Sequence, residues 1–323
     1  MRYRRAFKKC AAIILSFSMI VCTACGAKDK VDFEFSEGVK EVTWEPSSEH
    51  LIIETDEARE LYNRIKNEDY PSVEELKNSR VTAQIDELSD FGKAKYGITS
   101  EIDTPERDKL REDILNKFLN IGAARTESIE FKTGRAKYVY DGPLKKEYEM
   151  ELVLGLPASG KSTRVSDPDS EEMGAFILDC DVIKELIPEY EESHGIAADA
   201  VHMESMMIMD NALKAFTEGD MKGTNVILPI VADDFDSLME NYIKPFEEAG
   251  YNVRAKFVDC EVNVSMARNL ARELETGRII NSAVVFSFGD KPKEVYEKLA
   301  PMINSKGVPY GHEEKEEEIQ NAA

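Results

Sequence analysis

Residues 155–163, GLPASGKST, have the types and spacing of a phosphate-binding loop, G-x-x-x-x-G-K-[ST]. Glycines let successive backbone N–H groups point at one phosphate, while Lys161 adds a charge for the β and γ oxygens and Ser162 offers a ligand for Mg²⁺. An apolar stretch, MELVLGL, predicts a strand that enters the loop, and Pro168 predicts a short helix after it. The motif predicts nucleotide binding by Gly155, Pro157, Ala158, Ser159, Gly160, Lys161, Ser162 and Thr163.

Two acids follow the next apolar segment, in the sequence FILDCD. Ligands of open α/β sheets bind at the carboxyl ends of the strands, so Asp181 is expected to face the γ-phosphate. A carboxylate there can accept the proton of an attacking substrate hydroxyl, which makes Asp181 a candidate catalytic base. The alternative is a helix cap, because Asp181 precedes the helical pattern VIKELI, and both roles can coexist. Asp179 is interpreted as structural or as a Mg²⁺ ligand.

A group of arginines lies in the segment SMARNLARELETGR, residues 265–278. Its apolar positions recur every four residues and predict a helix that Gly277 ends, leaving Arg278 on the next loop. Arg268 and Arg272 then share the opposite face. Guanidinium groups suit the charge that develops on a phosphoryl group in transfer, so Arg272 and Arg278 are candidate catalytic residues. A solvated helix with Arg272 paired to Glu273 or Glu275 explains the spacing equally well.

Strands and helices alternate from about residue 148 onward, which predicts an α/β fold with a parallel sheet flanked by helices. The predicted strands are Glu149–Leu154, Ala175–Leu178, Asn225–Pro229 and Val253–Val258. The predicted helices between and after them are Ile196–Glu218, Asp234–Ala249 and Val264–Glu275. We assign residues 148–302 to this P-loop domain and residues 303–323 to an acidic tail.

Residues 47–147 predict a mainly helical extension. Apolar spacing predicts one helix in DEARELYNRIKN, a capping box at Ser72 and Glu75 predicts a second near 73–95, and Thr104 with Pro105 opens a third. Residues 126–145 have strand composition around a turn at 132–135. The extension is interpreted as a packing layer or as a part that docks a substrate or partner.

The first 24 residues have the pattern of a signal peptide: five basic residues, a short apolar run and small residues. Cys25 follows Thr23 and Ala24, as in a bacterial lipobox, although Cys22 stands where leucine is usual. We therefore expect lipidation at Cys25, a tether over 25–46 and an extracytoplasmic protein anchored to the cell membrane. The alternatives are an uncleaved anchor, an ordinary secretory signal or a cytoplasmic protein.

Charge and composition exclude several classes of protein. Acids outnumber bases 63 to 41, for a net charge of −22, which disfavours general binding of nucleic acid. The five cysteines and four histidines form neither a disulfide scaffold nor a zinc motif.

The ordered series GLPASGKST, FILDCDVIKELIPEY, VHMES, GTNVIL and the R…R…TGR segment resembles the zeta-toxin family of P-loop kinases over about residues 148–300. The resemblance implies transfer of the γ-phosphate of ATP, with Mg²⁺, to a hydroxyl, in the known case on UDP-N-acetylglucosamine. It implies that Lys161 binds ATP, that Asp181 is the base and substrate contact, and that Arg272 and Arg278 contact phosphates. Glu204 is an implied substrate contact or a charge on a helix surface. Related kinases order their strands 2-3-1-4, and an antitoxin is an expected type of partner.

The sequence departs from the family after the third strand. An acid, a small residue and a threonine are expected there, but Leu228, Pro229 and Ile230 stand in their place. Two hypotheses follow. The chain is an ATP-dependent kinase of a small molecule, or it is a lipid-anchored binding or interaction protein that keeps the fold with a degenerate substrate site. The second is favoured by the leader, and the first by the intact loop, Asp181 and the arginines.

Overall fold

The computed structural model describes residues 35–37, 39, 47, 49–97, 104–124, 129–131, 135–138 and 143–308. The chain divides into two compact units, Met1–Asp32 and Phe33–Ala323, and every described residue lies in the second. The predicted leader, Cys25, most of the tether and residues 309–323 therefore lie outside the described residues. No helix within the described ranges is long and apolar enough to cross a membrane.

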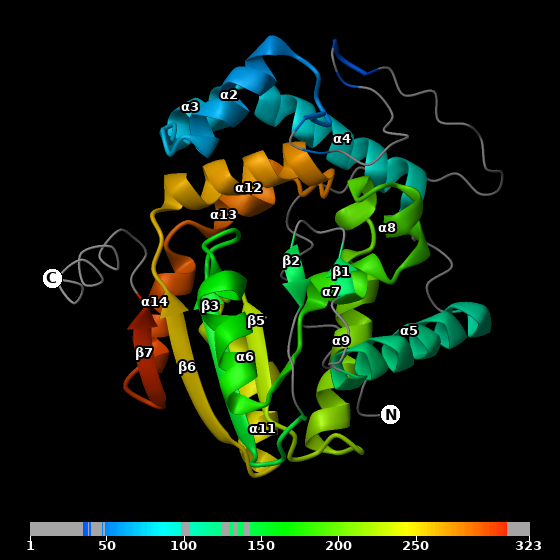
Figure 1. Ribbon diagram of the computed structural model, residues 1–323, viewed down its shortest axis with the longest axis vertical. Coiled ribbons are helices and arrows are strands. Elements are labelled where there is room, and N and C mark those ends of the chain that lie inside the picture. Colours follow the sequence, from blue (N-terminus) through cyan, green and yellow to red (C-terminus); the bar gives the residue numbers. More distant parts are fainter. Residues whose placement is uncertain are drawn as a thin grey trace, which may run out of the picture. The chain divides into compact units, whose positions relative to one another are not determined.

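A parallel sheet of five strands lies at the centre of the P-loop domain, in the order β4-β5-β3-β6-β7 (Figure 1). The strands are β3 (Glu149–Gly155), β4 (Phe176–Ile177), β5 (Val226–Ile230), β6 (Asn252–Val258) and β7 (Asn304–Val308). The first four along the chain stand in the order 2-3-1-4, which confirms the predicted order. The central strand β3 is buried from Met150 onward, because helices flank the sheet.

The fifth strand, β7, differs from the prediction, since it lies within the segment assigned to the acidic tail. Its sequence, NSKGV, carries no alternation of apolar residues. Pairing with β6, from Arg254 opposite Asn304 to Val258 opposite Val308, covers the edge of that strand. Backbone hydrogen bonds rather than side-chain pattern therefore define this element.

The helices that flank the sheet follow the predicted pattern, with α12 near its predicted position and one nearly continuous helical run over 235–248. Their bounds are η1 (Ser162–Ser166), α6 (Asp167–Met173), α7 (Cys180–Glu185), α8 (Pro188–Glu192), η2 (Ile196–Ala198), α9 (His202–Thr217), α10 (Phe235–Leu238), η3 (Met239–Ile243), α11 (Lys244–Glu248), α12 (Val262–Thr276), α13 (Ser282–Phe288) and α14 (Lys291–Leu299). Helix α9 begins at His202, later than the predicted start at Ile196, and the short 3-10 helix η2 and a turn precede it. Gly277 ends α12 with a φ of 72°, as predicted.

The helix after the phosphate-binding loop continues past Pro168, so the prediction of a short helix was wrong. Its first part is the π-helix η1, which runs directly into α6 and ends at Gly174 with a φ of 59°. A proline ring clashes with the carbonyl four residues earlier in a regular α-helix. The wider π turn in front of Pro168 accommodates that ring, and the helix goes on.

The N-terminal extension consists of α2 (Asp56–Lys66), α3 (Val73–Asn78), α4 (Arg80–Tyr96), α5 (Pro105–Ala124) and a hairpin of β1 (Ile129–Phe131) and β2 (Arg135–Tyr138). The capping box at Ser72 and Glu75 is confirmed. The single helix predicted near 73–95 is wrong, because Ser79 ends α3 and caps α4 through its hydroxyl. The hairpin occupies the segment of predicted strand composition.

The described chain has two main apolar cores. One lies between the sheet and its helices and includes Ile114 and Phe118 of α5. The other joins α2, α3 and α4 to α12 and the loop after it, and includes Ile85 and Leu88 of α4 as well as Leu270 and Leu274 of α12. The extension therefore covers the apolar face of the arginine-bearing helix α12, and Figure 1 shows α2, α3 and α4 beside this helix.

Candidate active site

The phosphate-binding loop is folded as its glycines predict. Gly155 and Gly160 have φ angles of 154° and 94°, and Ala158 adopts 52°. A Cβ on Gly155 would lie 2.9 Å from Ser159 Oγ and 2.9 Å from Val258 O, so a larger residue cannot enter there without displacing the loop. The loop is thus closed tightly against the end of β6, which suits backbone N–H groups that must converge on an anion.

Polar side chains inside the loop are held by the loop itself. Lys161 Nζ donates hydrogen bonds to Gly155 O at 2.9 Å and Leu156 O at 2.7 Å. Ser159 is fully buried, and its Oγ has no hydrogen-bond partner among the described residues. From α12, Ser265 Oγ donates to Pro157 O at 2.6 Å, which ties the start of the arginine-bearing helix to the loop. A buried hydroxyl without a partner fits a ligand that supplies an acceptor.

The two acids after β4 have separate positions. Asp179 is the N-cap of α7, and its Oδ1 accepts the Asp181 N–H at 2.8 Å, so the cap role left open for Asp181 belongs to Asp179. Asp181 is more exposed, and its Oδ1 lies 2.6 Å from Arg278 Nη2 and 3.5 Å from Lys184 Nζ. The structure therefore brings the candidate base and one candidate arginine together.

Arg278 is 4% exposed, although a guanidinium group is rarely buried without several partners. Burial disfavours its charge, but the neighbouring Asp181 carboxylate, together with Tyr190 and Glu273, outweighs burial and raises the pKa of Arg278. Its Nε and Nη1 have no hydrogen-bond partner within the described residues. Two buried cationic donors beside Asp181 are an arrangement that a phosphate group can satisfy.

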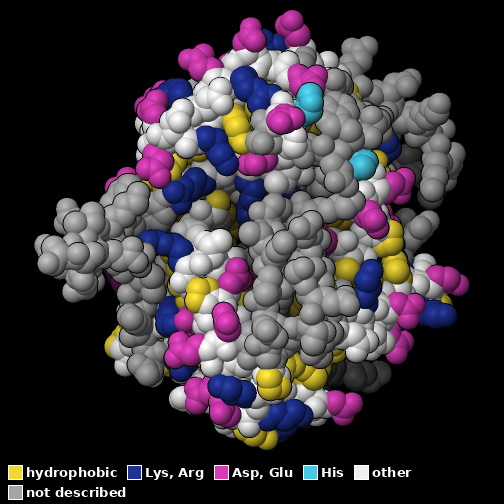
Figure 2. All heavy atoms as spheres, in the orientation of Figure 1, with side chains coloured by type: hydrophobic (Ala, Val, Ile, Leu, Met, Phe, Trp, Pro, Cys, Tyr) yellow, Lys and Arg dark blue, Asp and Glu magenta, His cyan; other side chains and the backbone are white. Residues whose placement is uncertain are grey.

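The other candidate arginines point to different partners. Arg272 Nη2 donates to Asn269 Oδ1 at 2.8 Å, an interaction that neither sequence hypothesis included. Arg268 Nε donates to Tyr70 OH at 3.1 Å, and its guanidinium carbon lies 5.5 Å from the centre of that ring. Tyr70 belongs to the extension, and nothing in its local sequence indicated this contact across the chain. Lys and Arg side chains gather over α12 and the helices near it (Figure 2).

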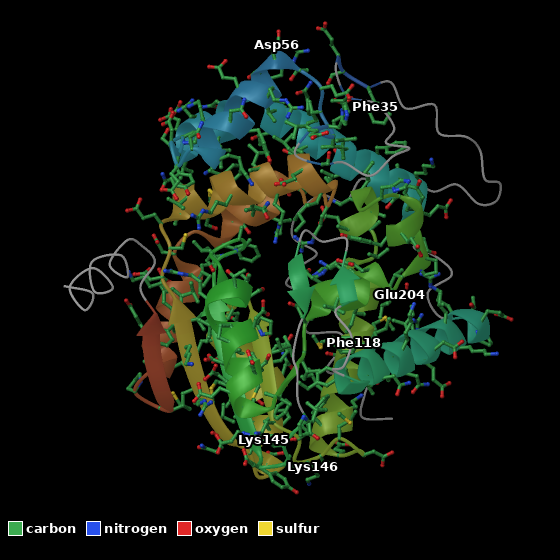
Figure 3. The ribbon with its side chains drawn as sticks, viewed as in Figure 1. Phe35, Asp56, Phe118, Lys145, Lys146 and Glu204 are labelled. Atoms are coloured by element: carbon green, nitrogen blue, oxygen red, sulfur yellow. The ribbon has the colours of Figure 1, made fainter. Side chains whose placement is uncertain are left out.

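Glu204 is buried on α9, near α5 and α8 (Figure 3), and is only 1% exposed. Its two oxygens pair with Arg107 and Arg111 of α5, and Arg111 Nε lies 3.2 Å from Oε1. Arg107 also donates to both oxygens of Glu189, at 2.8 and 2.9 Å. In this conformation the implied substrate contact is occupied by the extension rather than open to a ligand. The spacing of Arg107 and Arg111, four apart on one helix, was the only sequence signal of this pairing.

No group of three His, Cys, Asp or Glu side chains in the described part of the chain could hold a metal ion alone. Mg²⁺ in phosphate sites is usually bound by one or two protein oxygens together with phosphates and water. Ser162, the first residue of η1 after Lys161, has the position that the motif requires for this role. Asp179 is 5% exposed and engaged as a cap, so Ser162 fits the ion better.

The first four strands of the sheet along the chain stand in the spatial order 2-3-1-4, and the phosphate-binding loop follows β3, which is strand 1 of this order. This arrangement defines a P-loop kinase type of fold. Residues 142–301 match the family model described as Zeta toxin, which confirms the resemblance seen in the sequence. No curated protein sequence gives a significant match to the chain.

Several solved structures are similar to the chain. One belongs to the PezAT chromosomal toxin-antitoxin system of Streptococcus pneumoniae, with 13% identity over 64% of this chain and 78% of that one, and a TM-score of 0.45. Another is the AvrRxo1-ORF1:AvrRxo1-ORF2 complex with ATP, with 18% identity, 76% and 73% coverage and a TM-score of 0.46. A third is deoxyadenosine kinase from M. mycoides with bound dATP, with 15% identity, 54% and 98% coverage and a TM-score of 0.35.

Proposed function

We propose that the chain is an ATP-dependent phosphotransferase that moves the γ-phosphate to a hydroxyl group of a small molecule. The observation that carries this proposal is the contact of 2.6 Å between Asp181 and Arg278, whose two remaining buried donors have no partner in the described chain. The intact phosphate-binding loop and the match to the Zeta toxin family support it.

Each group then has a defined task. The loop N–H groups and Lys161 bind the β- and γ-phosphates, once Lys161 turns from the loop carbonyls towards the ligand. Asp181 accepts the proton of the attacking hydroxyl, and Arg278 stabilises the charge on the transferred phosphoryl group, with Arg272 as a second candidate. Bound Mg²⁺, held by Ser162, would neutralise phosphate charge.

The acceptor proposed from the resemblance is a UDP-sugar such as UDP-N-acetylglucosamine. Transfer from γ-labelled ATP to a panel of sugar nucleotides, nucleosides and free sugars tests both reaction and acceptor. We expect label on one class of acceptor with the wild type and far less with Asp181→Asn. Label that stays on ATP or appears only as inorganic phosphate would contradict the transferase.

A lipid-anchored binding protein with a degenerate substrate site is the second candidate. The specific observation that favours it is the pairing of Glu204 with Arg107 and Arg111, together with Leu228, Pro229 and Ile230 in β5. It predicts that ATP binds without transfer to any acceptor in the panel. An antitoxin-like protein partner is a proposal under either function.

We also propose that the protein is anchored to the outer face of the cell membrane by a lipid on Cys25. The supporting pattern is the basic start, apolar run and small residues before that cysteine. Labelled palmitate should enter the wild type and not Cys25→Ser. Equal labelling of both, or a cytoplasmic protein with its first residues intact, would contradict the anchor.

A further inference from the structure

The segment just after α12 has no regular secondary structure from Gly277 to Asn281, yet each of its backbone N–H groups is hydrogen-bonded. Every N–H from Arg278 to Ser282 has an acceptor, and three of the five acceptors are carboxyl oxygens, two of them from the aspartates Asp199 and Asp86. In order along the chain they are Thr276 Oγ1 (3.3 Å), Gly195 O (3.3 Å), Glu273 Oε1 (3.1 Å), Asp199 Oδ2 (2.8 Å) and Asp86 Oδ1 (2.6 Å). An irregular segment bonded at each residue is fixed in one conformation.

Two of those carboxylates connect the segment to α4 of the extension. Asp86 lies on α4 and accepts both the N–H and the hydroxyl of Ser282, each at 2.6 Å. Asp199 Oδ2 also accepts from Ser89 Oγ at 2.8 Å and lies 3.2 Å from Lys93 Nζ. Asp86, Ser89 and Lys93 lie at positions i, i+3 and i+7 of one helix and so share one face.

Close backbone packing makes a second connection. A Cβ on Gly92 of α4 would lie 2.4 Å from Ile196 O, and a Cβ on Gly195 would lie 2.8 Å from Gly277 O and 3.1 Å from Arg278 Cα. Helix α4, the turn at Gly195–Ile196 and the turn at Gly277–Arg278 are therefore packed without space between them. We therefore expect a shift of α4 to displace the turn that carries Arg278.

The hydrogen bonds of the Arg278 guanidinium do not by themselves fix its position. Asp181 accepts from Nη2, while Nε and Nη1 have no hydrogen-bond partner in the described chain. The position of the group thus depends on the backbone that carries it. Groups that stabilise a transition state must be held within a fraction of an ångström.

We propose that helix α4 is a positioning element of the active site, with Asp86 as the residue that holds Arg278 at Asp181 through Ser282. The inference rests on the proposed function and deepens it, since it assigns a task at the phosphate site to a helix outside the segment that matches the Zeta toxin family. Asp86 acts through the backbone and touches no substrate.

The test compares binding of Mg·AMP-PNP and Mg·ADP to the full-length chain by calorimetry. Arg278 faces the γ-phosphate, so only the triphosphate analogue should report its position. We expect Asp86→Ala to weaken the binding of AMP-PNP about 3- to 10-fold and to leave the binding of ADP unchanged. Arg278→Ala should change the two affinities in the same direction. Asp86→Asn keeps an acceptor for the Ser282 N–H and should restore most of the affinity. Asp90→Ala, an exposed acid on the same helix, should bind both as the wild type does.

Ser282→Ala removes only the hydrogen bond from the Ser282 hydroxyl to Asp86, and it tests the positioning role if Asp86→Ala does not fold. A selective loss for AMP-PNP in it supports positioning. Unchanged AMP-PNP affinity in the folded variants, or equal weakening of ADP and AMP-PNP, overturns the positioning role. If the wild type binds neither nucleotide, the proposed function itself fails, and that result is distinct from the other two.

Discussion

Asp181 and Lys161 are both engaged by the protein before any ligand arrives. Asp181 is held by Arg278 and Lys184, and Lys161 by two carbonyls of its own loop. These contacts keep each charged group in place at the carboxyl end of the sheet. The nucleotide must replace the partners of Lys161, whereas Asp181 can keep its cations during the reaction.

Separate substitutions should therefore separate binding from chemistry. Lys161→Ala removes a phosphate ligand, so we expect weaker Mg·ATP binding and no transfer. Asp181→Asn keeps the shape but loses the proton acceptor, so ATP affinity should persist while transfer falls about 10²- to 10⁴-fold. Calorimetry and a transfer assay on the same preparations measure both effects. Transfer at the wild-type rate in Asp181→Asn would remove the proposed base.

Arg107 is expected to matter for stability, because it pairs with a carboxylate that is 1% exposed. Replacing it with methionine keeps the apolar stem and leaves Glu204 with Arg111 as its remaining cation. Breaking a buried pair from one side costs about 3–5 kcal/mol, and the remaining partner reduces this to about 2–3 kcal/mol of unfolding free energy. Urea unfolding measures the loss. Lys109→Met, an exposed cation of α5, is the matched control and should change stability by less than about 0.5 kcal/mol.

At the scale of elements, α12 combines two functions in one helix. Its start holds the phosphate-binding loop through Ser265, and Arg278 follows its end. Its inner face carries a buried acid, Glu273, which bonds Asn269 Nδ2 and the Ile280 N–H. Burial raises the pKa of Glu273 to about 8, although the Ile280 N–H, Arg272 and Arg278 act in the opposite direction.

This raised pKa predicts a loss of stability as the pH rises. Between about pH 4.5 and 8 the folded protein retains a proton that the unfolded chain has released, so unfolding free energy falls by at most about 1.4 kcal/mol per pH unit from this group. Glu273→Gln keeps the acceptor oxygen and cannot ionise, so its stability relative to the wild type should increase with pH. Melting curves from pH 5 to 8.5 measure the difference. Glu275→Gln on the same helix is the control, and parallel curves for Glu273→Gln and the wild type would contradict the assignment.

Local sequence patterns predicted the elements that local interactions determine. The apolar run into GLPASGKST, the capping box at Ser72 and the αL position at Gly277 each depend on neighbouring residues, and each is found in the structure. The π turn before Pro168 was missed, because tertiary packing decides how a helix continues. The break at Ser79 was missed although it is a local feature, since the Ser79 hydroxyl accepts the Thr82 N–H and caps α4. Strand β7 was missed because pairing with β6, and not a pattern in its own sequence, makes this segment a strand.

The candidate site was predicted only in part, for a related reason. Asp181 and Arg278 could be named from the motif series, but their contact at 2.6 Å joins residues 97 positions apart. The pairing of Glu204 with Arg107 and of Arg268 with Tyr70 joins segments 97 and 198 positions apart. Local spacing contains no information on which distant side chains meet.

At the scale of the whole molecule, the sheet order separates the two cysteines of the described chain. Cys180 follows β4 and Cys260 follows β6, with β5 and β3 between these strands, and both thiols are free. Three steps of about 4.8 Å place the strands roughly 14 Å apart, whereas a disulfide needs Cα atoms within about 7 Å. We expect no Cys180–Cys260 bridge after treatment with an oxidant. Peptide mapping by mass spectrometry checks this, and a bridged peptide pair would contradict the strand order.

Because α2–α4 share a core with α12, the folding of this core cannot finish during synthesis until α12 has been made. Partners in this layer, such as Lys66 and Glu275, are 209 residues apart. A ribosome that adds about 5–20 residues per second needs on the order of 10–40 s to cover that distance. Throughout that interval Leu270 and Leu274 of α12, which belong to the same core as Ile85 and Leu88, have not yet been made. The nascent chain thus remains incompletely folded until its last quarter emerges, which leaves time for a chaperone to bind it.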